Sequence, residues 1–173
     1  MTKNLLTQLK GGDRRSIGRS DEIAESVLKN PRLFAALFKG LWSEDPLVRM
    51  RAADAVEKVT RTKRELLQRY KIELLGLMAE VEQQEVRWHL AAVVPRLELN
   101  ARERQRVVTI LQEYLKDRSS IVRTFALQGL AELAESDESI RPMVMEVLRE
   151  SVRSGTAAMK ARSRNLLAQM EKR

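Results

Sequence analysis

Apolar residues recur along much of this chain at intervals of three and four, which is the spacing of one face of an α-helix. The pattern is clearest in four segments that align with one another: DPLVRMRAADAVEKV (45–59), QEVRWHLAAVVPRL (84–97), SSIVRTFALQGLAEL (119–133) and GTAAMKARSRNLLAQM (155–170). Four residues share one position in these segments, at spacings of 38, 36 and 37: Val48, Val86, Val122 and Met159. The sequence therefore predicts four equivalent helices at a nearly constant spacing.

Each of these helices follows another segment that has an apolar stripe of its own. The preceding helices are expected at 31–42, 64–81, 101–116 and 138–152, with two earlier helices at 20–29 and 3–10. Asn100 followed by Glu103 predicts a capping box at one helix start. Pro95 lies inside a repeated helix and cannot donate a backbone hydrogen bond, so we expect that helix to bend or end near 91–94.

A helix pair of this length cannot bury its apolar faces alone, so consecutive pairs must stack to form a continuous core. We therefore expect an all-α protein, an α-solenoid superhelix of about four helical pairs with one or two additional N-terminal helices. One domain, 1–173, is expected to divide into N-terminal helices with a basic loop (1–30) and four repeats (31–61, 62–97, 98–135 and 136–173). In the last repeat Ser163 and Arg164 replace small or apolar residues, which is typical of a terminal capping repeat.

The repeated motif is a polar or acidic turn, then Val-Arg, then alanine-rich positions and a Leu/Val seam. Over about 31–170 it resembles the HEAT-repeat family, in particular its short bacterial type, on the segments DPLVRMRAADAVEKV, QEVRWHLAAVV and SSIVRTFALQGLAEL. The resemblance implies that the second helix of each pair lines a concave wall. It also implies that the arginine after the repeated valine pairs with an acidic turn residue of a neighbouring repeat. Asp45 matches that role but Gln83, Ser119 and Thr156 do not, so we expect such pairing to be incomplete.

Composition and charge exclude several classes of function. The chain has no cysteine, which excludes disulfides, thiolate catalysis and cysteine-bound zinc. The formal net charge is +8, but five Lys or Arg against one acidic residue occur in 1–19 and again in 160–173, while 20–159 holds 22 of each sign. Because residues 20–159 carry no net charge, a long positively charged groove is not expected. No segment has the apolar run of a secretory signal or a membrane span, so we expect a cytoplasmic protein without a membrane partner.

Candidate binding residues lie on the helix side opposite to the apolar seam, which on the resemblance is the concave wall: Met50, Arg51, Asp54, Trp88, His89, Arg96, Phe125 and Gln128. Trp88 is the preferred anchor because large amphipathic rings are enriched in binding hot spots, although the ring could also pack on an adjacent repeat. His89 is the single histidine, and few groups are present to complete a catalytic site with it. Asp54 and Glu57 share a helix face, but exposed acids of this kind are usually solvated. We therefore expect no enzyme activity, cofactor or metal.

The loop GGDRRSIGR (11–19) is a second candidate site. Arg14, Arg15 and Arg19, together with glycine backbone amides, are suited to hold a phosphate or another anion. The alternative is a capped helix end followed by a solvated linker.

Together these features favour a non-catalytic interaction module, an adaptor or scaffold, that binds a protein partner on its concave wall. Nucleic-acid binding is the alternative, as in the HEAT-like DNA-alkylation-repair glycosylases, although no stretch matches the catalytic motif of that family. A subunit of a bilin-attaching lyase is a third reading, because those repeats look similar, and no specific residue supports it. The pattern predicts neither the identity of the partner nor the oligomeric state.

Overall fold

A computed structural model of the chain describes residues 2–13 and 15–172. Within these residues the secondary structure is helical and contains no strand. The α-helices are α1 (Thr2–Thr7), α2 (Ser20–Lys29), α3 (Phe34–Phe38), α4 (Pro46–Thr60), α5 (Lys71–Glu80), α6 (Gln84–Val93), α7 (Ala101–Tyr114), α8 (Ser120–Ser136), α9 (Arg141–Ser154) and α10 (Ala157–Glu171). Short 3₁₀ turns occupy Pro31–Leu33, Lys39–Trp42, Arg64–Tyr70, Val94–Arg96 and Glu138–Ile140. The all-helical fold class is confirmed.

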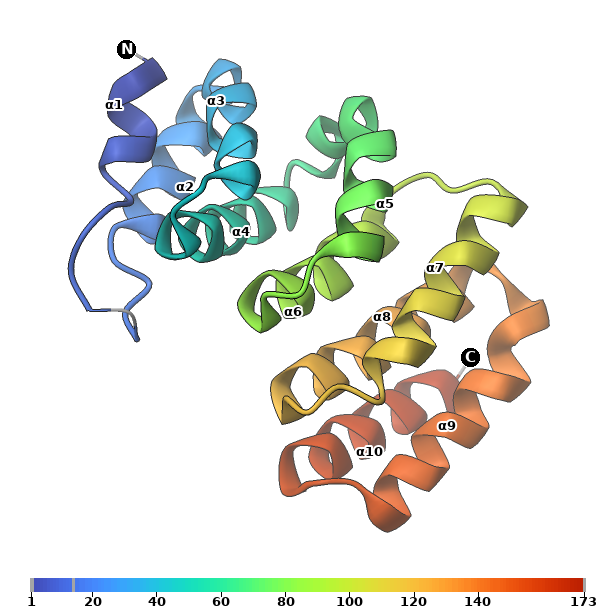
Figure 1. Cartoon of the computed structure of the whole chain (residues 1–173). Helices are drawn as coiled ribbons and strands as arrows, with labels where there is room; N and C mark the ends of the chain where they lie inside the picture. The colour runs from blue at the N-terminus through green and yellow to red at the C-terminus, as the bar shows by residue number, and fades with distance from the viewer. Residues whose placement is uncertain (1, 14, 173) are drawn as a thin grey trace.

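The even-numbered helices contact one another in the order in which they occur along the chain. Helix α2 packs on α4, α4 on α6, α6 on α8 and α8 on α10. The odd-numbered helices α3, α5, α7 and α9 each contact the even-numbered helix that follows in the chain. Figure 1 shows the resulting progression from α1–α4 at the upper left to α9 and α10 at the lower right. We call α2, α4, α6, α8 and α10 the second-helix layer.

The repeated valine position of the sequence is buried in every helix in which it occurs. Val48, Val86, Val122 and Met159 are all buried in the core. The residues five positions later, Ala53, Ala91 and Leu127, are buried as well, whereas Arg164 at the same position in α10 is exposed. Ser163, which was expected on a polar outer face, is instead fully buried, because its position is that of the buried Ala52, Leu90 and Ala126.

The helix boundaries follow the local signals of the sequence. Helix α6 ends at Val93 and continues as a 3₁₀ turn through Pro95, as the missing backbone donor of a proline requires. Asn100 and Glu103 form the expected capping box at the start of α7. The segment 31–42 differs from expectation, since only Phe34–Phe38 is α-helical between two 3₁₀ turns. No helix of the described residues is both long and apolar enough to cross a bilayer.

Candidate functional site

A buried arginine attaches the N-terminal loop to the second-helix layer. Arg51 of α4 is only 2% exposed. Its guanidinium donates hydrogen bonds to four backbone carbonyl oxygens, those of Leu9, Gly11, Asp13 and Ser16, at 2.6–3.1 Å. The expectation that Arg51 faces a partner on an open wall is therefore corrected, because residues 9–13 and 16–18 lie over its guanidinium.

Glycines make this contact sterically allowed. Gly11, Gly12 and Gly18 all have positive φ, a backbone region that residues with a Cβ rarely adopt. At Gly18 an added Cβ would also lie 2.7 Å from the Arg51 guanidinium carbon. The loop thus presents carbonyl oxygens to a cation, while its amides at Arg15 and Gly18 donate to the side chains of Asp13 and Ser16.

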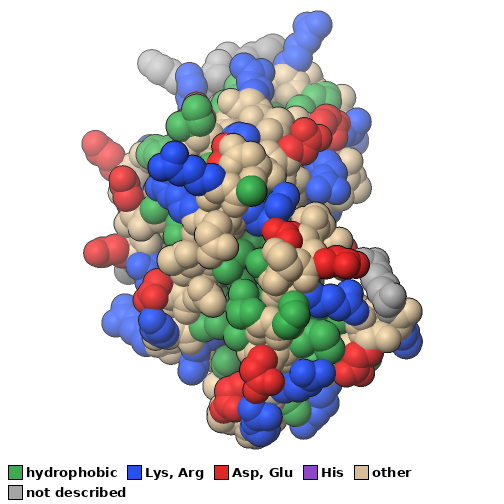
Figure 2. Space-filling view, turned by 90° about the vertical axis from the view of Figure 1, so that its right-hand side faces the viewer, with side chains coloured by type: hydrophobic (Ala, Val, Ile, Leu, Met, Phe, Trp, Pro, Cys, Tyr) green, Lys and Arg blue, Asp and Glu red, His purple; other side chains and the backbone are tan. Residues whose placement is uncertain are grey.

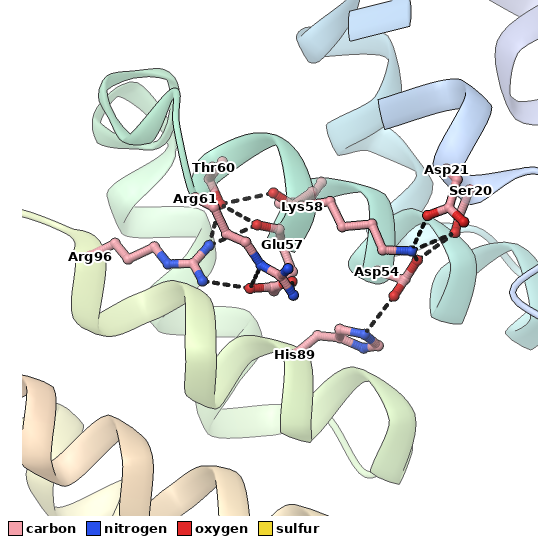
Figure 3. A network of polar contacts seen from close by, with 10 residues as sticks. Ser20, Asp21, Asp54, Glu57, Lys58, Thr60, Arg61, His89 and Arg96 are labelled. Carbon is pink, nitrogen blue, oxygen red and sulfur yellow. Dashed lines mark hydrogen bonds and ion pairs between the residues drawn. The ribbon is translucent and has the colours of Figure 1, made fainter. Parts of the chain in front are cut away.

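Asp54, one turn after Arg51, joins α2, α4 and α6. Its carboxylate accepts hydrogen bonds from the Ser20 hydroxyl of α2 and, at 2.6 Å, from Lys58 Nζ of α4. His89 Nε2 of α6 lies 3.4 Å from the other carboxylate oxygen. Lys58 also reaches Asp21 at 2.5 Å, so one cation bridges two carboxylates of neighbouring helices. Figure 3 shows this cluster and the next one along α4.

Glu57 forms the second cluster, with two arginines. Arg96, which follows α6, donates to a Glu57 carboxylate oxygen at 2.5 Å and to the Glu57 backbone carbonyl at 2.8 Å (Figure 3). Arg61, the residue directly after α4, adds two hydrogen bonds to the Glu57 carboxylate. The Glu57 side chain is 8% exposed. The expectation that Asp54 and Glu57 are solvated acids is therefore wrong, because basic side chains of α4 and of the α6 segment pair with both.

These contacts determine the protonation of the two acids. Burial alone would raise the pKa of Asp54, but hydrogen bonds from His89, Lys58 and Ser20 outweigh it and hold the pKa well below its usual value. At Glu57 burial is again opposed, by Arg61 and Arg96, and the pKa is lowered. Both acids are therefore carboxylates at neutral pH.

His89 lies between helices instead of facing solvent. Its side chain is 12% exposed. Nδ1 lies 2.6 Å from the carbonyl oxygen of Glu85, one turn earlier, and Nε2 faces Asp54. Nε2 thus joins α6 to α4, while Nδ1 contacts the backbone of α6 itself.

Trp88, Met50 and Ile17 line a common pocket of about 410 Å³ beside these clusters. Its walls come from α4, from α6 and from the N-terminal loop, which also contributes Arg15. Trp88 is partly buried and packs against the hydrophobic core on one side, while Ile17 is 43% exposed. The Trp88 and His89 rings contact each other, with centroids 5.6 Å apart. The pocket therefore combines three apolar side chains with polar and charged ones of both signs: Arg15, Ser16, Arg51, Asp54, Glu85 and His89.

No protein-family model, no curated protein and no solved structure gave a significant match to this chain.

The remaining candidate residues are distributed over two other places. Gln128 and Arg96 line a second, polar pocket of about 360 Å³ between the end of α4, the 3₁₀ turn Val94–Arg96 and α8. Phe125 is partly buried, with the Arg162 guanidinium of α10 5.7 Å from its ring centroid. The structure thus separates Arg96, Phe125 and Gln128 from the pocket at Trp88.

The arginines of the loop 11–19 do not lie together either. Arg15 lines the Trp88 pocket, whereas Arg19 pairs with Glu22 at 2.6 Å at the start of α2. Arg14 lies outside the described residues. Among the residues that the structure describes, no group of three His, Asp or Glu side chains is arranged to hold a metal ion.

The arginines after the repeated valines do contact the next helix pair, but through other acceptors than expected. Arg49 donates to the Gln83 amide oxygen at 2.8 Å, and Arg87 to Asp117 at 2.7 Å. An amide oxygen accepts as a carboxylate does, so Gln83 suffices where an acid was expected. Asp117 lies two residues before the expected Ser119, in the same turn. Asp45 instead caps α4 by accepting from the Leu47 amide.

Several residues of the site were missed by sequence reasoning. Ser20, Lys58 and Thr60 complete the polar clusters, and Ile17 completes the pocket. The three glycines of residues 11–18 were the available signal, since a loop with this conformational freedom can fold closely onto a neighbouring helix.

Proposed function

We propose that the chain is an α-solenoid built from HEAT-like helical pairs. The ordered contacts within the second-helix layer support this, as do the equivalent burial of Val48, Val86 and Val122 and the contacts of Arg49 and Arg87 with the next pair. Such a stack buries a continuous core and leaves an extended surface for binding. The exposed Arg164 is consistent with a capping role for α10.

On this scaffold, we propose that the protein is a non-catalytic interaction module. Its protein partner inserts a large apolar side chain into the pocket beside Trp88. The observation that carries the proposal is the pocket itself, where apolar side chains from the N-terminal loop, α4 and α6 meet: Ile17, Met50 and Trp88. An aromatic side chain that is supported on one side and open on the other is a typical hot-spot anchor.

The polar clusters make this pocket rigid before a partner binds. Arg51 holds the loop that carries Arg15 and Ile17, and Asp54 joins α2 to α4 and α6. A preformed site loses less conformational entropy on association, so a modest apolar pocket can still give useful affinity.

Selection from a display library of random peptides tests the proposal. Peptides selected on the wild-type protein should share a large apolar residue, and their affinity should fall at least about tenfold, or about 1.4 kcal/mol, on Ile17→Ser or Trp88→Ala. Ile72→Ser is the matched control, because Ile72 is 82% exposed on α5 and does not line the pocket. Peptides that bind Ile17→Ser and Trp88→Ala as tightly as wild type would contradict the proposal.

Nucleic-acid binding remains the alternative, on the observation of a net charge of +8. Against it, Lys58, Arg61 and Arg96 are all paired with carboxylates. Figure 2 shows positive and negative side chains interspersed around hydrophobic ones on one face of the molecule. A labelled duplex titrated at about 50 and 200 mM salt discriminates the two functions, since phosphate contacts weaken steeply with salt. Binding that falls by roughly 10³-fold or more across that range would favour the alternative.

A further inference from the structure

The arginine of the third repeated helix differs from its two counterparts. Arg49 and Arg87 each donate a side-chain hydrogen bond to an oxygen in the turn that precedes the next helix of the second-helix layer. Each also donates to a backbone carbonyl six residues earlier, that of Ser43 or Val81. Arg123 occupies the same position in α8.

Among the described residues, the turn before α10 makes no hydrogen bond with the Arg123 side chain. Ser154 donates its hydroxyl to Glu150, and Thr156 caps α10 and contacts Ser120 at 2.8 Å. Among the described residues no hydrogen bond or ion pair reaches the Arg123 side chain, and its Nε is shielded from solvent without a partner. A buried donor that lacks an acceptor is costly, so such a group indicates an acceptor that the chain does not itself supply.

Arg123 lines a cavity of about 540 Å³ between α8, α9 and α10. The walls are mainly apolar, with Leu115, Leu127, Val147 and Met159. Ser151, which is 6% exposed, also lines the cavity, and its hydroxyl has no hydrogen-bond partner either. Two unpaired polar side chains in an apolar cavity of this size have the composition of a small-molecule site.

We propose that this cavity binds a small aliphatic monocarboxylate. The carboxylate accepts from the Arg123 guanidinium, as Asp117 does from Arg87, and the Ser151 hydroxyl is the second donor. The aliphatic body packs on Leu127 and Met159. This site is separate from the Trp88 pocket and does not depend on the function proposed for it.

The acidic residues of the cavity restrict the ligand to a single charge. Glu146 and Glu150 line it, and they share one cation, Arg153, at 3.2 and 2.7 Å. The remaining negative charge repels a polyanion more strongly than a monoanion. Inorganic phosphate is therefore expected not to replace the carboxylate.

Titration of ¹⁵N-labelled full-length protein with 4-methylpentanoate, followed by two-dimensional NMR, tests the site. Amide signals near Leu127, Ser151 and Met159 should shift and saturate, while those near Trp88 stay unchanged. Arg123→Met should weaken binding at least about tenfold, because it removes a charge-assisted contact. Arg149→Met is the matched control, since Arg149 is exposed on α9 outside the cavity, and it should bind as wild type.

A second variant keeps Arg123 in place. Val147→Trp fills the cavity from α9 and should abolish the shifts even if Arg123→Met does not fold. The proposal is overturned if no saturable shift occurs up to about 10 mM, where a complex of millimolar Kd would be mostly formed. It is equally overturned if phosphate produces the same shifts, or if Val147→Trp binds as wild type.

Discussion

Arg51 attaches the loop that forms one wall of the Trp88 pocket. Its guanidinium is paired with no carboxylate but with four carbonyl oxygens of one loop, and that loop carries Arg15 and Ile17 to the pocket. Hydrogen bonds from a charged donor contribute about 1.5–3 kcal/mol each, of which ordering the loop offsets a large part. When the Arg51 side chain is truncated, we therefore expect the loop to lose its fixed position on α4.

Arg51→Met keeps the length of the side chain but removes every donor. We expect amide hydrogen exchange of residues 9–18 to accelerate strongly, with α8 unaffected, and a loss of about 2–3 kcal/mol in the free energy of unfolding. Hydrogen exchange read by mass spectrometry and urea unfolding measure the two effects. Arg102→Met, which alters an exposed arginine of α7, should change neither. Unaltered protection of residues 9–18 in Arg51→Met would refute the anchoring role.

The ion pairs of Glu57 lead to a prediction for the pH dependence of the free energy of unfolding. Its folded pKa is lowered, as is that of Asp54, so the stabilisation is complete above the unfolded value near 4 and is lost as pH falls through the folded values. Wild-type stability should thus fall steeply below about pH 4–5. Glu57→Gln keeps an oxygen that can accept from Arg96 but removes the negative charge that pairs with Arg96 and Arg61. It should cost about 1–3 kcal/mol at neutral pH, with a shallower acid dependence.

Urea unfolding at a series of pH values measures both effects. Glu113→Gln is the control, because Glu113 is 63% exposed and its ion pair with Lys116 should contribute less than about 1 kcal/mol. Equal acid dependence of wild type and Glu57→Gln would show that the Glu57 cluster does not control acid stability.

At the scale of the elements, packing within the second-helix layer determines which side chains are buried more than the apolar pattern of each single helix does. A helix in this layer contacts its pair partner and also the helices before and after it in the layer. Side positions of α4 such as Arg51, Asp54 and Glu57 therefore face neighbours, not water. The helices of this layer also approach one another closely. At Gly129 of α8, an added Cβ would lie 2.6 Å from the Ala91 carbonyl oxygen of α6.

Gly129→Ala should consequently force α6 and α8 apart and destabilise the protein by about 1–3 kcal/mol, as overpacking does. Gly76→Ala is the matched change in α5, where the added Cβ meets nothing within 4 Å. It should stabilise by about 0.5–1 kcal/mol through helix propensity alone. Thermal unfolding of the two variants compares them directly, and a stabilised Gly129→Ala would mean that α6 and α8 are not in close contact.

For the whole molecule, local signals predicted the helices and non-local contacts escaped prediction. The spacing of apolar residues, Pro95 and the Asn100–Glu103 pair determine helix positions and ends through contacts within a few residues. The burial of Arg51 depends on a loop some 40 residues earlier in the chain, which no helical wheel contains. Trp88, Met50 and Asp54 lie on the helix side that the pattern singles out, and they line one pocket. Ile17 and Ser20 were not foreseen there, because they too come from a segment far away in the sequence.

The central claim is that a protein partner docks at the Trp88 pocket, and site-specific photo-crosslinking tests it most directly. A benzophenone amino acid, itself a large apolar side chain, replaces Ile17 in the wall of the pocket, or Ile72 on α5 as control, since both isoleucines are exposed. After irradiation in native lysate, position 17 should give a discrete crosslinked protein that position 72 does not give and that Trp88→Ala removes. The same adducts from both positions, or adducts at position 17 that persist in Trp88→Ala, would contradict the claim.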